Sequence, residues 1–324
     1  MRTRTKALMV ALALVAFTQG ATAQDFPSRP ITFVIPLGAG GVLDVMARVI
    51  GAKLSERLGG RAVVIENRTG GGTVIGAQAV ARAAPDGHTL LFAPSGTLTT
   101  NVALYKSLPY DPVKDFVPVA LYNKIPFVLV VHPSLPVQSV ADLIKLAKSR
   151  TLSYASTGTG AVPHMAGELL KSMTGVEMTH VPYRGVTQTL TDVIAGHVQM
   201  TFASPESAMS AIKDGRVRAL GVSSLTRVPV LPDVAPIADS GLPGFEAVSW
   251  HLVVAPAGTP APVVNMLHRE FKAITAAPEM QRMIGDMGLI AVDTPSLDEL
   301  RRFLENEIAL WGKLVRQAGI AGSQ

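Results

Sequence analysis

A glycine-rich segment, Pro36–Asp44, separates a short β-branched run, Ile31–Ile35, from an amphipathic stretch. Glycines at a helix start let backbone N–H groups face outward, and the helix end adds about half a positive charge. The segment therefore suits a carboxylate or phosphate. A tight turn in which Asp44 stabilises its own helix dipole is the alternative. The candidate ligand contacts here are Leu37, Gly38, Ala39, Gly40 and Gly41.

A second segment of this kind, Ser156–Gly160, follows the expected strand 152–155 and precedes an expected helix that carries His164 and Glu168. Its small residues and hydroxyls again leave donors free for an anion. Two such segments in separate halves of the chain indicate a cleft, and two unrelated connecting loops are the alternative. A helix-start histidine that bonds nearby backbone is the alternative for His164. The candidate contacts here are Ser156, Thr157, Gly158, Thr159, Gly160 and His164.

Five further residues complete the candidate ligand-binding set: Ser95, Thr97, Arg184, Ala203 and Ser204. Arg184 is the one cationic side chain expected near the cleft, with a solvated surface arginine as the alternative. Asp44 would repel a bound carboxylate if it pointed into the cleft. We therefore expect it to turn away and to bond backbone, which would support the loop.

Other site chemistries find little support in the sequence. The segment after Gly38 lacks the third glycine of a dinucleotide fingerprint, and no phosphate-loop motif occurs. The seven histidines never stand at i, i+2 or i, i+4 from one another, so we expect no metal and no cofactor. No cysteine is present, and Ser95 lacks the glycine that a G-x-S-x-G nucleophile requires. We therefore expect no catalytic residue.

The first 23 residues are typical of a secretory signal peptide, with Arg2, Arg4 and Lys6 before an apolar run and Ala21-Thr22-Ala23 as a cleavage site. Removing them takes three positive charges from the formal net charge of +5 and leaves +2. A near-neutral surface argues against nucleic acid as a partner. We expect an exported, periplasmic protein that has no lipid anchor, because the chain lacks cysteine.

Short β-branched runs alternate with amphipathic stretches along the remaining chain, which predicts βαβ units around largely parallel sheets. At 324 residues the chain is long enough for two domains. One series of units occupies the first 124 residues and a second begins near Phe127. A last strand, 250–255, and the helices that follow are too little for a third domain. We therefore expect one discontinuous lobe, 25–124 with 249–324, and a second lobe, 125–248.

Several short motifs in one order resemble the extracytoplasmic solute-binding receptors of the tripartite tricarboxylate transporter family, often called Bug receptors. Besides the two glycine-rich segments they include Pro27-Ser28-Arg29-Pro30-Ile31, Glu66-Asn67-Arg68, Ala84-Pro85-Asp86-Gly87-His88, His180-Val181-Pro182-Tyr183-Arg184-Gly185 and Ala255-Pro256-Ala257-Gly258-Thr259-Pro260. The resemblance implies a type II-like, two-lobed α/β periplasmic binding protein. Each lobe would be a mainly parallel sheet flanked by helices, with the ligand cleft between the lobes. The resemblance also implies a small carboxylate as ligand and membrane transporter subunits as partners, and we expect a monomer.

Three positions depart from the pattern that this family often shows. Gly38 stands where proline is common, Leu43 where threonine is common, and Ala203 where aspartate is common. The last two changes remove polar groups, so we expect an organic acid of modest size with an apolar or aromatic body and no amino group. A periplasmic hydrolase or isomerase that acts on a small carboxylate in the same cleft is the alternative, with His164 and Asp44 as its acid/base candidates. An exported protein-interaction module is a third class.

Overall fold

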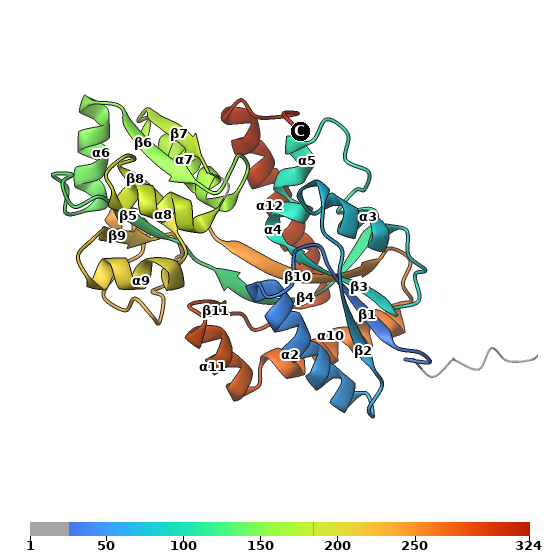
Figure 1. Ribbon diagram of the computed structural model, residues 1–324. Coiled ribbons are helices and arrows are strands. Elements are labelled where there is room, and N and C mark those ends of the chain that lie inside the picture. Colours follow the sequence, from blue (N-terminus) through green and yellow to red (C-terminus); the bar gives the residue numbers. More distant parts are fainter. Residues whose placement is uncertain (1–25, 184) are drawn as a thin grey trace, which may run out of the picture.

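The structure, a computed structural model, describes residues 26–183 and 185–324 (Figure 1). The expected signal peptide, residues 1–23, and Arg184 lie outside the described residues. The chain forms two sheets with helices on both faces of each. We call each sheet with its helices a lobe.

The first sheet has six strands in the order β11-β4-β10-β3-β1-β2. Its strands are β1 (Ile31–Ile35), β2 (Val63–Asn67), β3 (Thr89–Pro94), β4 (Phe116–Ile125), β10 (Ser249–Pro256) and β11 (Ile290–Ala291). β1 pairs in parallel with β2 and β3, whereas β10 runs antiparallel to both β3 and β4. The sheet therefore contains strands from both ends of the described chain.

The second sheet has five strands in the order β7-β6-β8-β5-β9. Its strands are β5 (Val128–Val131), β6 (Leu152–Ser156), β7 (Met178–Pro182), β8 (Met200–Ala203) and β9 (Arg218–Val222). β6 is parallel to β7 and β8, and β5 is antiparallel to β8 and β9. In each sheet, the strand through which the chain arrives from the other lobe runs against its neighbours.

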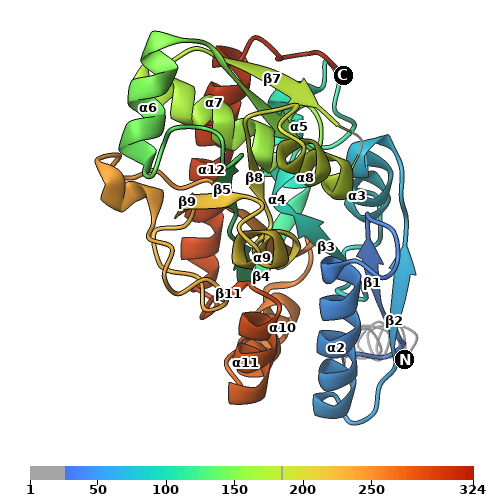
Figure 2. The ribbon, with the colours of Figure 1, turned by 60° about the vertical axis from the view of Figure 1, so that its left-hand side comes forward.

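Helices cover both faces of each sheet (Figure 2). On the first sheet, α2 (Val42–Arg57), α10 (Ala261–Thr275) and α11 (Pro278–Asp286) pack on one face, and α3 (Val74–Ala81), α4 (Ser95–Leu98) and part of α12 (Leu297–Gln317) pack on the other. On the second sheet, α6 (Val140–Ser149) and α7 (Val162–Thr174) lie opposite α8 (Val186–Ile194) and α9 (Pro205–Lys213). The short elements are α5 (Thr100–Leu104) and two 3-10 turns, Gly71–Thr73 and Ile237–Ser240.

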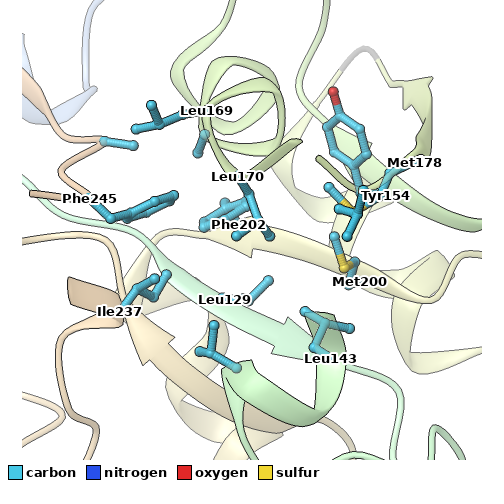
Figure 3. Close-up of a cluster of buried hydrophobic side chains, with 14 of the residues drawn as sticks. Leu129, Leu143, Tyr154, Leu169, Leu170, Met178, Met200, Phe202, Ile237 and Phe245 are labelled. Carbon is cyan, nitrogen blue, oxygen red and sulfur yellow. The ribbon is translucent and has the colours of Figure 1, made fainter. Parts of the chain in front are cut away.

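The core of the second lobe shows why an uninterrupted apolar run forms a central strand. Along β5, Leu129 and Val131 pack into the cluster under α6 and α7, whereas Val128 and Val130 pack into the cluster under α8 and α9. Successive side chains of a strand point to opposite faces, so a strand that is covered on both sides needs apolar residues at every position. Figure 3 shows Leu129 within the first of these clusters, near Phe202 and Ile237.

Helix α12 connects the two lobes. Its first half places Leu300 and Leu304 in the core of the first lobe, and its second half places Trp311 and Leu314 in the core of the second. Figure 1 shows α12 between α7 and α5, and it contacts both. At its middle, Glu307 accepts hydrogen bonds from the indole N–H groups of Trp250 (2.7 Å) and Trp311 (2.9 Å).

The predicted fold class is confirmed, with both sheets mixed rather than purely parallel. Strand β4 is absent from the expected elements because Pro118, Asn123 and Lys124 interrupt its apolar pattern. The residue boundaries proposed for the two lobes stay a prediction, since α12 packs on both. None of the helices in the described part of the chain combines the length and apolar character that a membrane span requires.

The shared acceptor at Glu307 generates a stability prediction. Glu307→Leu leaves two indole N–H groups without a partner, one of them on the fully buried Trp250. We expect it to lower the free energy of unfolding by about 2–4 kcal/mol in urea titrations. Glu307→Gln keeps an acceptor oxygen and should lower the free energy of unfolding by less than about 1 kcal/mol. A Leu variant as stable as the Gln variant would contradict this account.

Candidate functional site

A cavity of ≈ 280 Å³ lies between the two lobes. The first lobe contributes Leu37, Pro94, Ile125, Ser249 and His251, and the second contributes Phe127, Thr157, Ala161, Val162, Pro163, Thr189, Leu190, Thr201, Phe202, Ala203 and Ser204. Some of them follow or end β1, β3, β6 and β8, and the others come from the start of β10, the β4–β5 connection and helices α7 and α8. Carboxyl ends of parallel strands are where α/β sheets bind ligands, so the cavity is the candidate site.

The loop between β1 and α2 is held by its own helix. Gly40 adopts a positive φ of 86°, and its N–H donates to Asp44 Oδ2 at 2.9 Å. Gly41 precedes the helix in extended conformation, and no side chain caps the first-turn amides of α2. The first amides of a helix have no intrahelical acceptor, so this end of α2 presents unpaired donors.

The loop between β6 and α7 repeats this local structure in the other lobe. Gly160 has a φ of 80°, and its N–H donates to His164 Nδ1 at 3.0 Å. Ala161 precedes α7 in extended conformation, and no side chain caps this helix either. In each lobe, the third residue of the helix therefore fixes a glycine amide four residues earlier.

Asp44 is fully engaged inside its loop, as the sequence analysis predicted. Its carboxylate also accepts from Arg48 Nε and Nη2 (both 3.0 Å) and from Asn67 Nδ2 (3.0 Å). These hydrogen bonds, with that from Gly40, lower the pKa of Asp44 to about 2. Because Arg48 pairs with its charge, Asp44 does not offset the positive end of α2.

His164 is buried next to the cavity rather than in it. Its ring stacks on His180, with centroids 3.8 Å apart, and Tyr154 lies beyond, where its hydroxyl donates to Glu168 at 2.6 Å. Burial lowers the pKa of both histidines, that of His180 to about 4. His164 is therefore neutral and accepts the Gly160 N–H, which is the alternative that the sequence left open.

Four of the sequence-predicted contacts line the cavity: Leu37, Thr157, Ala203 and Ser204. The rest of the two loops lies beside it without lining it: Gly38, Ala39, Gly40 and Gly41, and Ser156, Gly158, Thr159 and Gly160. Gly160 stands where the lobes touch, because a Cβ there would come within 2.9 Å of Leu104 in α5.

Three predicted hydroxyls are engaged within the protein. Ser156 Oγ lies 2.6 Å from His180 Nε2, and Thr97 Oγ1 donates to Thr73 Oγ1 at 2.7 Å. Ser95 Oγ lies 2.9 Å from the Oγ of Ser249, which lines the cavity. Arg184 falls outside the described residues, so its position relative to the cavity stays a prediction.

The sequence analysis missed the contribution of the lobe connections and of β10. Ile125 and Phe127 flank the first connection, and Ser249 and His251 begin β10. His251 could have been noticed as a lone histidine in an otherwise apolar run, Trp250–Ala255. Nothing in the local pattern of Ile125 or Phe127 distinguishes them from ordinary core residues.

The network around Asp44 generates a prediction about charge. Asp44→Asn weakens the pairing with Arg48 and loosens the loop, so ligand affinity should fall about three- to tenfold. The preference among anionic, neutral and cationic ligands should stay unchanged, because Asp44 does not line the cavity. Isothermal titration measures both quantities, and a switch toward cationic ligands would show that Asp44 faces the ligand.

The buried histidines generate a prediction about pH. His164, His180 and His251 have lower pKa values in the folded protein than the usual 6.5, so the unfolded chain binds more protons below about pH 6.5. Stability should therefore fall as pH drops from 7 to 5, with about 1–2 kcal/mol from His180. Asp44 contributes almost nothing in this window, because its folded pKa of about 2 and its ordinary value of 3.8 both lie below pH 5.

Urea titrations of the wild type and of His180→Gln at pH 7 and pH 5 check this pH effect. The variant should lose less stability on acidification than the wild type. An equal loss in both proteins would show that other groups cause the effect.

Known proteins share this sequence and architecture. Residues 46–320 match the family model described as "Tripartite tricarboxylate transporter family receptor". The chain is 41% identical over 320 residues to the "UPF0065 protein in tcbD-tcbE intergenic region" of Pseudomonas sp. (strain P51). This match covers 97% of this chain and 94% of that protein.

Two solved structures extend the comparison. "R. palustris Rpa4515 with adipate" is 38% identical with a TM-score of 0.76, and the match covers 92% of this chain and 99% of that one. "Structure of periplasmic binding protein BugD" is 32% identical with a TM-score of 0.72, and the match covers 91% and 99%. The resemblance found in the sequence is confirmed, and the chain belongs to the tripartite tricarboxylate transporter receptor family.

Proposed function

We propose that this chain is a periplasmic solute-binding protein that captures a small organic carboxylate without an amino group and delivers it to a membrane transporter of the tripartite tricarboxylate type. The observation that carries the proposal is that the loops leading into two uncapped helix starts, those of α2 and α7, both contribute residues to one cavity between the lobes. Each favours an anion by at most roughly 1–2 kcal/mol. Ordered water can extend their donors to the ligand.

The walls of the cavity favour an apolar or aromatic ligand body. Ile125, Phe127, Leu190 and Phe202 contribute large apolar side chains to the lining. Ala203 ends β8 at the cavity and is 6% exposed, so a methyl group stands where an ammonium would need an acceptor. Among the described lining residues, no carboxylate is present to pair with an amino group.

The connections between the lobes support closure over the ligand. β4 ends at Ile125 and β5 begins at Val128, while β10 begins at Ser249 on the return. Ile125, Phe127 and Ser249 also line the cavity, so a hinge at these two points would couple closure to binding. We accordingly place the lobes at 25–124 with 249–324 and at 125–248, with α12 as a shared support.

The relatives support the class of ligand and the compartment. The R. palustris protein has adipate bound, and BugD is a periplasmic binding protein. We extend a carboxylate ligand and a periplasmic location to this chain by similarity. The family match supports the proposed transporter partnership, and we propose that the protein acts as a monomer.

Hydrolysis or isomerisation in the cavity is the competing function. It would need an acid/base pair, and Asp44 and His164 are both bonded inside their loops rather than lining the cavity. This arrangement favours binding without turnover. Incubation with each bound carboxylate, followed by product analysis, decides between the two functions.

A thermal-shift screen over mono-, di- and tricarboxylates, aromatic acids and amino acids, followed by isothermal titration, tests the proposal. A carboxylic acid should bind at micromolar or lower Kd and raise the Tm. Its α-amino derivative should bind at least tenfold more weakly, because the ammonium is desolvated without a partner. Micromolar binding of an amino acid, with weaker binding of the deaminated acid, would contradict the proposed ligand class.

Ala203→Asp is the matched variant for this screen. Its carboxylate at the end of β8 supplies an acceptor, so discrimination against the amino derivative should shrink by about tenfold or more. Ala52→Asp adds the same charge on the exposed side of α2 and serves as the control, with no change expected.

A further inference from the structure

His251 brings an unsatisfied polar group to the cavity. The side chain is only 3% exposed and lines the cavity at the start of β10. Its Nδ1 is buried and has no hydrogen-bond partner among the described residues. Its neighbour Trp250 packs on the opposite face, against α12. Burial lowers the pKa of His251 to about 3, so the ring is neutral near pH 7.

Two neighbours of His251 on β4 also have buried polar groups without a hydrogen-bond partner among the described residues. Asn123 stands opposite His251 in the β4–β10 register, and neither its amide nitrogen nor its oxygen has a partner in the described part of the chain. The Tyr122 hydroxyl is also buried without a partner, and its ring lies 5.7 Å from the His251 ring, centroid to centroid. More than nine in ten buried polar groups in proteins are hydrogen-bonded. Three exceptions together indicate a polar partner that the chain itself does not supply.

Ser249 adds a hydroxyl to the same end of the cavity. It precedes His251 by two residues, so both side chains lie on one face of β10. Both line the cavity, and the Ser249 hydroxyl is backed by that of Ser95 at 2.9 Å. The cavity therefore has a polar region on β10 of the first sheet, formed by a different element from the helix starts proposed to hold the carboxylate.

The chemistry of this region favours a neutral group. A neutral imidazole and a serine hydroxyl donate and accept hydrogen bonds but bring no positive charge. Among the described residues, no lysine or arginine lines the cavity. A second carboxylate placed beside His251 would be desolvated without a counter-charge, which is costly. A hydroxyl or carbonyl can be satisfied there at no such cost.

We propose that His251, assisted by Ser249, determines specificity by binding a hydroxyl or carbonyl group on the part of the ligand away from its carboxylate. This inference rests on the proposed function and narrows its ligand class to hydroxy- or oxo-carboxylates. Tyr122 and Asn123 are the neighbours of this ring on β4.

Isothermal titration with matched acids tests this assignment. The probes are benzoate with its 3- and 4-hydroxy and 3- and 4-acetyl derivatives, and C4–C8 alkanoates with the corresponding ω-hydroxy acids, oxo acids and dicarboxylates. In the wild type, at least one hydroxy or oxo acid should bind about tenfold or more tightly than its parent. His251→Leu should remove most of that preference and change the affinity for the parent acid less than about threefold.

Two further variants keep the test decisive. Ser249→Ala should reduce the same preference in part and covers the case in which His251→Leu fails to fold. His197→Leu, at an exposed histidine that is not part of the cavity lining, should leave the preference unchanged. Carboxylates that bind without any preference for a hydroxyl or carbonyl group, or a preference that survives both cavity variants, would overturn this inference alone. Failure of every carboxylate to bind would overturn the proposed function as well.

Discussion

A hydrogen bond from a loop glycine to the third residue of the following helix organises both sides of the cavity. In the first lobe, Gly40 donates to Asp44, and in the second, Gly160 donates to His164. Each bond holds a positive-φ glycine in place and leaves the helix start without a side-chain cap. The lobes thus present the same donor-rich element to one space, and the rest of the fold keeps these two elements opposed.

The two lobes hold the loop glycine with acceptors of different charge. Asp44 is ionised and needs Arg48 to balance its charge, whereas His164 is neutral because it is buried against His180. A carboxylate at the first helix start could not tolerate an unpaired aspartate. The ion pair between Asp44 and Arg48 therefore has two effects. It stabilises the start of α2, and it allows an anion to bind there.

Much of the architecture could be predicted because it rests on local patterns. Uninterrupted apolar runs such as Val128–Val131 become strands covered on both faces, and both glycine-rich loops fall at strand-to-helix connections. The shared spacing of Gly40 with Asp44 and of Gly160 with His164 is also visible in the sequence. Strand β4 was missed because the buried polar residue Asn123 breaks the expected alternation.

The cavity itself was predictable only in part. Its walls combine the lobe connection at Ile125 and Phe127 with the start of β10, and these segments lie more than 120 residues apart in the chain. Their meeting depends on how β10 inserts between β3 and β4 and on α12, which packs on both lobes. Neither arrangement leaves a periodic signal. The role of His251 becomes visible only when its neighbours Asn123 and Tyr122 are found to have no hydrogen-bond partner among the described residues.

The central claim is that two opposed helix starts hold one carboxylate, and a crystal structure of the complex with the tightest-binding acid from the screen tests it most directly. The account predicts the carboxylate between the loops Leu37–Gly41 and Thr157–Ala161, within direct or single-water hydrogen-bond reach of amides from both. A carboxylate bound by only one loop, or outside the cavity between the lobes, would contradict it.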